Sequence, residues 1–487
     1  MPSCSSEPKR LYWMALTVLC AAMSACSDED DHVTAAHRTG DGDEAISSVT
    51  IEANRFVRDV MSDYYYWEAE MPSLDYKKQS DTEEYFYSLL SSKDRFSYIS
   101  SDAQATIDGF EGKYTDFGWE YKLSYLSSTS DSVVAIVTYV YDATPASAAG
   151  VRRGDVVYAV DGKAINSDNY RTLFVNAASG SFAAYRVENG NLAKVSYSMA
   201  AADITENPVA LSRIIDNADG SKVGYLFYTS FSYTFNDDLV AAFKSFADGG
   251  VSDVVLDLRY NPGGDLEALS YMCSMLAPKS AVDNKDEMLF YDFNDKLKTL
   301  ASYSRDSSSV YFSDEPGVNL DLSRLVVLVG PDTYSASEAT IWSLMPYSDV
   351  TLIGDTTGGK NSMMYVMSPE DFTYASSGMP YYSSSINNWL IMPIVAIYKN
   401  TTGQAFDTSL GYGLPPTYYV PDLASVLTKG LKPIGDPDEN LLAAALPYLS
   451  TGSVSTNKNL QLPEALRSFG SSADSKPQVL YRRLVKR

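Results

Sequence analysis

The chain has 487 residues, of which 45% are hydrophobic and 21% charged, a balance typical of a folded protein with two or three domains. Its net charge of -24 excludes nucleic acid as the main partner, because so acidic a surface repels phosphate backbones. Only two histidines, His32 and His37, and four cysteines are present. We therefore expect no zinc site of ordinary ligand type, and we predict neither a metal nor a cofactor.

The first 25 residues have the pattern of a bacterial signal peptide. Lys9 and Arg10 precede the apolar run LYWMALTVLCAAMSA, which is shorter than the ~20 residues of a transmembrane helix. The run ends in MSAC, which resembles a lipobox, although Met23 stands where Leu is usual. The pattern predicts cleavage before Cys26 and a lipid on its sulfur, with ordinary secretion as the alternative. We expect a lipid anchor in the cell envelope, at the outer membrane, facing the periplasm or the outside.

Residues 26–45 are predicted to be an acidic linker. The tract SDEDD after Cys26 is either solvated chain or an export signal similar to that of Bacteroidetes surface lipoproteins. The only cysteine beyond it is Cys273, in the apolar run LSYMCSML, so the mature chain cannot build a disulfide framework. We interpret Cys273 as a core residue.

Helical spacing dominates residues 46–111. Both IEANRFVRDVMSDYYYW and DTEEYFYSLLSS repeat apolar residues at this spacing, which predicts a small N-terminal helical domain. Strand patterns follow in KYTDFGWEYKLSYL and SVVAIVTYVY. Pro145 to Ala149 suits a short helix that Gly150 ends, and VRRGDVVYAVDGKAI reads as two strands joined by a tight Asp161-Gly162 turn.

Together these elements resemble a PDZ domain over residues 112–203, with an unrelated β-subdomain as the alternative. In the PDZ fold a loop before the second strand offers N–H groups to a peptide's terminal carboxylate, and the peptide adds as a strand to the sheet edge. The resemblance places Asp116, Phe117 and Gly118 in that loop.

From residue 204 to 445 strands and helices alternate, which predicts a layered α/β domain with a mostly parallel sheet. The strand patterns are KVGYLFYTSF, VSDVVLDLRYNPGG, SRLVVLVGP and VTLIGDT, and the intervening helix patterns are NDDLVAAFKSFADGG, DLEALSYMCSMLAP and SASEATIWSLMPY. Sites in such sheets gather at the carboxyl ends of strands. Residues 446–487 are predicted to be a C-terminal polar, basic tail. Its end, YRRLVKR, is expected to be solvated, with contact to anionic lipid or to the protein's acidic surface as alternatives.

Ser335 and Lys360 follow two of these strands. A serine that opens a helix commonly serves as its N-cap, but the helix start also favours a developing oxyanion beside the hydroxyl. A lysine after a turn is commonly exposed, but one buried in an apolar pocket has a lowered pKa and can replace histidine as a base. Gly263 and Gly264 form either a plain turn or, with the N–H of Ala336, an oxyanion hole.

In combination, LDLRYNPGG, SASE and GGK behind a PDZ-like region resemble the carboxyl-terminal processing peptidases, or tail-specific proteases, over residues 46–445. The resemblance implies a catalytic core similar to Clp protease and crotonase. It also implies that Ser335, and not Ser337, is the nucleophile, with Lys360 as base. One of Gly263 and Gly264, together with Ala336, would bind the oxyanion.

This chain departs from the family beside its lysine. Many relatives have a Gln four residues after the lysine that orients the amine, whereas this chain has Met364. Asn361, Ser362 or another group could take over that role. We predict a serine endopeptidase that captures C-terminal segments of polypeptides through its PDZ domain. The alternatives are a peptide-binding surface lipoprotein with a vestigial catalytic core, and Ser-Lys amidase or esterase chemistry on a small molecule.

Overall fold

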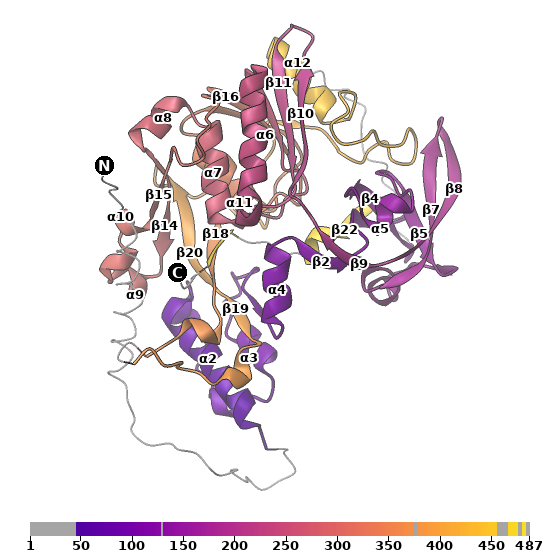
Figure 1. The fold of residues 1–487 in the computed structure, drawn as a ribbon. Coiled ribbons are helices and arrows are strands. Elements are labelled where there is room, and N and C mark those ends of the chain that lie inside the picture. The colour runs from indigo at the N-terminus through magenta and orange to yellow at the C-terminus, as the bar shows by residue number, and fades with distance from the viewer. Residues whose placement is uncertain (1–44, 128–129, 375–376, 455–465, 476–479, 484–487) are drawn as a thin grey trace, which may run out of the picture.

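The computed structural model describes residues 45–127, 130–374, 377–454, 466–475 and 480–483 (Figure 1). The predicted signal peptide, the lipidation site Cys26 and nearly all of the acidic linker lie outside the described residues. Within the described ranges, no helix has the length and apolar character that crossing a membrane requires.

The N-terminal region is helical, as predicted. Three helices form it: α2 (Ser48–Tyr64), α3 (Thr82–Ser88) and α4 (Ala103–Phe110). Each begins after a side chain that accepts a hydrogen bond from a backbone N–H of the first turn, the usual way of satisfying these groups. The three capping residues are Ser47, Asp81 and Asp102.

An antiparallel β domain follows the helices. Its elements are β2 (Lys113–Asp116), β3 (Trp119–Tyr125), β4 (Val133–Val140), α5 (Pro145–Ala148), β5 (Val156–Val160), β6 (Lys163–Ala164), a π-helical turn (Arg171–Val175), β7 (Ser179–Glu188), β8 (Asn191–Ala200) and β9 (Ala202–Thr205). The predicted Asp161-Gly162 turn joins β5 and β6, and both residues have positive φ, 50° and 75°. Strands β2 and β9 pair with each other where the chain enters and leaves the domain.

The larger domain contains the predicted parallel sheet. Its strands are β10 (Val209–Asp216), β11 (Lys222–Tyr228), β12 (Asp253–Asp257), β16 (Arg324–Val329), β17 (Asp349–Gly354) and β21 (Tyr418–Tyr419), adjacent in that order. Every pair from β11 to β21 is parallel, and only β10 is antiparallel. The central strands β11, β12 and β16 are buried on both faces, which explains their continuous apolar runs in the sequence.

Helices cover both faces of this sheet. On one face lie α6 (Asn236–Gly249), α7 (Leu266–Leu276) and α11 (Ala336–Leu344), and on the other lies α12 (Leu442–Thr451). Cys273 of α7 is fully buried, in agreement with its prediction as a core residue. Helix α11 also contacts β14 and β20 of a second sheet, so it lies between two sheets (Figure 1).

The second sheet was not predicted. Its order is β13 (Gly264–Asp265), β23 (Leu480–Arg483), β18 (Ser362–Val366), β20 (Ile394–Asn400), β14 (Glu287–Phe293) and β15 (Ser309–Tyr311). The remaining elements are short: β1 (Tyr98–Ser100), α8 (Lys279–Asn284), α9 (Asp295–Lys298), α10 (Arg305–Ser308) and β19 (Leu390–Met392).

The predictions of a polar, basic tail over residues 446–487 and of a solvated end are wrong for the described parts, which form a helix and strands. Helix α12 packs on the parallel sheet, β22 (Arg467–Ser471) pairs with β3, and β23 lies between β13 and β18. Tyr481 is buried and stacks on Phe110 with ring centroids 4.3 Å apart. Strands β22 and β23 join their sheets through backbone hydrogen bonds, which leave no apolar pattern in the sequence.

Candidate active site

The three sequence motifs lie at one edge of the parallel sheet. Strands β12, β16 and β17 are parallel neighbours, with Leu256 opposite Val327 and Val327 opposite Leu352. Each motif follows the carboxyl end of one of these strands: the glycine turn after β12, Ser335 after β16 and Lys360 after β17. The topology therefore gathers the predicted residues at a single edge, as expected for an α/β sheet.

Ser335 has a strained backbone and a buried hydroxyl without a hydrogen-bond partner. Its φ of 56° and ψ of -107° are conformations that non-glycine residues rarely adopt, at a cost of roughly 1–3 kcal/mol. The side chain is completely buried, and its Oγ bonds to no group in the described structure. Ser335 occupies the N-cap position, but its hydroxyl does not cap the helix. The strain and the partnerless hydroxyl instead suit a nucleophile presented by a sharp turn.

Lys360 is completely buried, which excludes the alternative of an exposed surface lysine. Its Nζ lies 2.9 Å from Sδ of Met364 and 5.1 Å from the ring centroid of Phe96. Burial lowers the pKa of the amine from 10.5 to about 7, because desolvation disfavours the ammonium form. The negative charges of Asp94 and Glu338 oppose this effect and hold the pKa up. A substantial fraction of the amine is therefore neutral near pH 7.

Two side chains tie the backbones of Ser335 and Lys360 together. Oε2 of Glu338 accepts from the N–H of Ser335 at 2.9 Å and from that of Lys360 at 2.8 Å. The hydroxyl of Tyr398 lies 2.9 Å from the carbonyl oxygen of Lys360 and 3.2 Å from that of Ser335. The strand-end turns are thus clamped to each other through both their N–H groups and their carbonyls.

Sequence reasoning missed both clamp residues. The sequence did contain a signal for the role of Glu338. It stands three residues after Ser335, which is the spacing at which a glutamate side chain accepts from the N–H of the N-cap residue. Its other oxygen accepts from the N–H of Gly359 at 2.8 Å and from the hydroxyl of Thr357. Burial raises the pKa of Glu338, while these hydrogen bonds favour its carboxylate. Tyr398 lies on β20 of the unpredicted sheet and had no local signal.

Of the groups considered for orienting the amine, Met364 is the one in contact with Nζ of Lys360. Asn361 donates its side-chain N–H to the carbonyl of Phe406 at 2.9 Å. Ser362 begins β18 opposite Ile397. The residue four positions after Lys360 therefore contacts the amine through its sulfur.

The predicted oxyanion donors differ in their availability. The N–H of Ala336, at the first position of α11, has no acceptor among the described residues. The N–H of Gly263 donates to Oδ1 of Asn261 at 2.9 Å and is occupied in this state. Gly264 has φ of 143°, and a Cβ there would lie 1.9 Å from the carbonyl oxygen of Phe231, so only glycine fits.

The glycine turn is anchored to both strand and helix. The carbonyl of Asn261 accepts from the hydroxyl of Ser337 at 3.0 Å, which gives the second motif serine a structural contact. Arg259 is buried and ion-paired with Asp257 at 2.8 Å and with Glu439 at 2.6 Å. Removing one partner of such a buried pair leaves an uncompensated charge, so this network holds the turn in place.

Asp116 is the last residue of β2, and Phe117 and Gly118 connect it to β3. The N–H of Gly118 donates to Oδ1 of Asp116 at 2.8 Å. The ring of Phe117 lies in the domain core, 5.2 Å from that of Phe182. The N–H of Gly118 is therefore already hydrogen-bonded to a neighbouring side chain.

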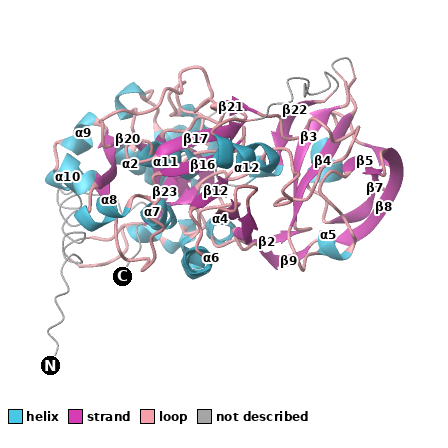
Figure 2. Ribbon diagram, turned by 90° about the horizontal axis from the view of Figure 1, so that it is seen from above, coloured by secondary structure: helices cyan, strands magenta, loops and turns pink. Residues whose placement is uncertain are grey.

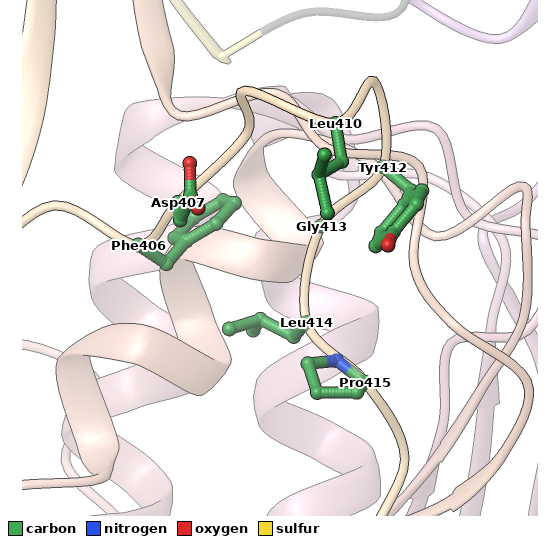
Figure 3. Close-up of a pocket in the computed structure, with 7 residues that line it drawn as sticks. All are labelled: Phe406, Asp407, Leu410, Tyr412, Gly413, Leu414 and Pro415. Atoms are coloured by element: carbon green, nitrogen blue, oxygen red, sulfur yellow. The ribbon is translucent and has the colours of Figure 1, made fainter.

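A cavity of about 220 Å³ lies in the loop after β20 (Figure 3). Its lining residues are Phe406, Asp407, Leu410, Tyr412, Gly413, Leu414 and Pro415, which include neither Ser335 nor Lys360. The loop borders the lysine turn, since the N–H of Gly413 donates to the carbonyl of Thr357 at 2.9 Å. Among the described residues, no group of three or more His, Cys, Asp or Glu side chains could hold a metal ion.

Comparisons with known proteins find peptidase and PDZ matches along the chain. Residues 222–393 match peptidase family S41, residues 52–98 match the peptidase S41 N-terminal domain, and residues 136–173 match the PDZ domain. A solved S41-family structure from Bacteroides fragilis is 26% identical, with a TM-score of 0.63, and the match covers 85% of this chain and 99% of that one.

Curated relatives are also similar. A carboxyl-terminal-processing protease of Picosynechococcus is 27% identical over 55% of this chain and 63% of its own length. The carboxy-terminal processing protease CtpA of Bacillus subtilis is 24% identical over 53% of this chain and 51% of its own length. The chain thus spans between about half and two thirds of the length of these relatives. The fold and these matches support the PDZ-containing carboxyl-terminal processing peptidases of family S41, a family of serine peptidases, as the family that this chain resembles.

Proposed function

We propose that the chain is a serine endopeptidase in which Ser335 is the nucleophile and Lys360 the general base. One observation carries this proposal: a buried amine with a pKa of about 7 and a buried, partnerless hydroxyl sit on two turns that Glu338 and Tyr398 clamp together. A neutral amine of this kind can take the place of an imidazole.

The reaction then follows in balanced steps. Nζ of Lys360 takes the proton of the Ser335 hydroxyl as Oγ bonds to the scissile carbonyl carbon. The N–H groups of Ala336 and Gly264 bind the resulting oxyanion. As the C–N bond breaks, the ammonium of Lys360 returns the proton to the leaving amine. Water then attacks the acyl-enzyme, giving one proton through Lys360 to Oγ, and the acid product leaves.

The substrates of this proposal are unstructured polypeptides, held along the PDZ domain by a C-terminal segment before they reach Ser335. Edge addition to β3 would supply sequence-tolerant backbone hydrogen bonds. The extended chain could then pass to the sheet edge where the two turns meet.

The test is cleavage of an unstructured polypeptide by the full chain and its variants. Ser335→Ala and Lys360→Ala should each lower kcat/KM by about 10³-fold or more, because the two groups act as a unit. Ser343→Ala is a matched control, since Ser343 is a buried serine of the same helix whose hydroxyl also lacks a partner. Undiminished cleavage by either active-site variant refutes the dyad.

An active-site serine probe separates the peptidase from a vestigial binding protein. A fluorophosphonate should label Ser335 in the wild-type chain and lose that label in Ser335→Ala. A purely binding lipoprotein would show no labelling at all. The lowered pKa of Lys360 favours labelling, because the neutral amine can activate the hydroxyl.

We also propose that Cys26 carries the lipid anchor and holds the peptidase at the outer membrane. The basic, apolar and small-residue pattern that ends at Cys26 supports this. A single acyl chain binds membranes only weakly, so stable anchoring needs more than one. Cys26→Ala should move the protein from the membrane fraction to the soluble fraction and abolish labelling by fatty acid. Retention of the label would disprove the site.

A further inference from the structure

The edge of the PDZ sheet is occupied by the chain's own C-terminal region. Strand β22 pairs antiparallel with β3, the strand that follows the Asp116–Gly118 loop (Figures 1 and 2). The ring of Phe469 lies 4.5 Å from that of Tyr125 on β3 and 5.5 Å from that of Tyr170, just before the π-helical turn. Phe469 thus contacts both β3 and the segment before this turn, and the strip between these two elements is called the groove below.

The direction of β22 is that of a bound peptide. Arg467 is opposite Tyr125, and Ser471 is opposite Lys122, which is earlier on β3. Strand β22 therefore runs toward the loop before β3, and the hydroxyls of Ser124 and Ser468 lie 2.9 Å apart across the pair. This is strand addition to a sheet edge, carried out within one chain.

The end of the groove binds a hydroxyl. The buried Oγ of Ser472 accepts from the N–H of Tyr121 at 3.0 Å and donates to the carboxylate of Glu120. Glu120 is itself buried. At the same end of β3, Oδ1 of Asp116 accepts a hydrogen bond from the N–H of Gly118. The hydroxyl of Ser472, in a chain that continues past this place, thus gives the buried carboxylate of Glu120 a hydrogen-bond donor.

The same C-terminal region reaches the catalytic sheet. In β23, Leu480 is opposite Gly264, the candidate oxyanion glycine, and Tyr481 is opposite Met364, the residue in contact with the amine. An ion pair of 2.5 Å between Lys122 and Asp332 also joins β3 to the loop that leads to Ser335. Ser335 is completely buried in this arrangement, so the candidate nucleophile is closed to solvent.

We propose that β22 and β23 are an intramolecular peptide ligand: β22 fills the PDZ groove as an internal segment read through Phe469 and Ser472, β23 closes the catalytic edge, and a substrate enters by displacing them. The gating of cleavage rests on the proposed peptidase function, whereas occupancy of the groove does not.

The groove is tested by peptide binding to the full chain, with a fluorescent peptide LRSFGSSADS (the sequence of residues 466–475) as the probe. Ser472→Asp should release β22, because the new carboxylate faces Glu120, and should bind the probe at least tenfold more tightly than wild type. A tethered ligand competes at a high effective concentration, which explains the weak binding to wild type. Ser453→Asp, at an exposed position before β22, is the matched control and should bind like wild type. Equal binding by wild type and Ser472→Asp overturns the proposal.

A reversible lock tests the gate and does not depend on releasing β22. In the double variant Ser124→Cys with Ser468→Cys, the two replaced hydroxyls are close enough for a disulfide across β3 and β22. The oxidised form should lose probe binding and cleavage of an unstructured polypeptide by at least tenfold, and reductant should restore both. The single variant Ser468→Cys, treated identically, should not respond. Oxidised protein that cleaves as fast as the reduced form overturns the gate. If no variant cleaves but probe binding follows the expected order, groove occupancy is supported and the proposed peptidase function fails.

Discussion

The Nζ of Lys360 lies 2.9 Å from Sδ of Met364, four residues further along the chain on β18. A thioether is a weak acceptor, so it contacts the amine without stabilising its charge as strongly as an amide oxygen would. Apolar packing around Lys360 thus favours the neutral form that a base requires. Replacing this thioether by an amide should therefore change how the amine is held, and this difference can be measured.

The pH dependence of cleavage should report the amine. Lys360 acts as base only when neutral, and its pKa is about 7, so kcat/KM should fall tenfold per pH unit below about 7 and level off above it. The measurement is kcat/KM on an unstructured polypeptide from pH 5 to 9 in constant ionic strength. An acidic limb centred near the ordinary lysine pKa of 10.5 would contradict a desolvated amine.

Met364→Gln should shift this limb to higher pH. The amide oxygen is a stronger acceptor than sulfur, and a difference of about 1 kcal/mol in its bond to the ammonium raises the pKa of Lys360 by roughly 0.7 units. The measurement is again the pH profile of kcat/KM. Met363→Leu, in the neighbouring buried position, is the control and should leave the limb in place. A limb that moves to lower pH in Met364→Gln would contradict the role given to the sulfur.

Asp94→Asn should shift the limb in the opposite direction. The negative charge of Asp94 raises the pKa of Lys360, so its removal lowers that pKa and makes the base available at lower pH. The asparagine oxygen can still accept from the N–H groups of Phe96 and Ser97, both 2.9 Å from Oδ1 of Asp94. Asp102→Asn, in the N-cap of α4, is the matched control. An unchanged limb in Asp94→Asn would show that its charge does not reach the amine.

Local sequence patterns predicted that the turns of Ser335 and Lys360 lie together. They did not predict the hydrogen bonds that join the two turns. Apolar runs predicted β16 and β17 as buried parallel strands, and parallel strands end at the same edge, so Ser335 and Lys360 were expected together. Tyr398 reaches that edge from a sheet whose strands come from distant parts of the chain. Such pairing depends on tertiary contacts that no short window contains.

The C-terminal strands show the same limit more clearly. The segment RSFGS has one large apolar residue and no alternation, so nothing in it predicts a strand. It becomes β22 because the edge of β3 offers unpaired backbone groups. The sequence pattern predicted β3 as a strand, but nothing in the sequence predicted that β22 would pair with it.

Lys360→Met should stabilise the fold, and more at low pH than at high pH. The folded pKa of about 7 lies below the ordinary 10.5, so between these values the unfolded state binds more protons and wild-type stability rises with pH. Below about pH 7 the buried ammonium destabilises the wild type by up to about 5 kcal/mol relative to a neutral amine. Urea unfolding at pH 6 and pH 9 measures this, with Lys244→Met at an exposed position of α6 as control. A stability difference that is larger at pH 9 would reverse the sign and contradict the depressed pKa.

Ser335→Gly should be more stable than Ser335→Ala, although both should be inactive. Both variants remove the hydroxyl, but only glycine adopts φ of 56° and ψ of -107° without strain. Relief of that strain should outweigh the greater entropy of the unfolded glycine chain and leave a net gain of about 1 kcal/mol. Chemical unfolding of the two variants at pH 8 measures the difference directly. Ser343→Gly and Ser343→Ala, within α11, form the control pair and should rank in the reverse order, because glycine destabilises a helix interior by roughly 1 kcal/mol. If alanine is the more stable residue at both positions, the turn that carries Ser335 is not strained.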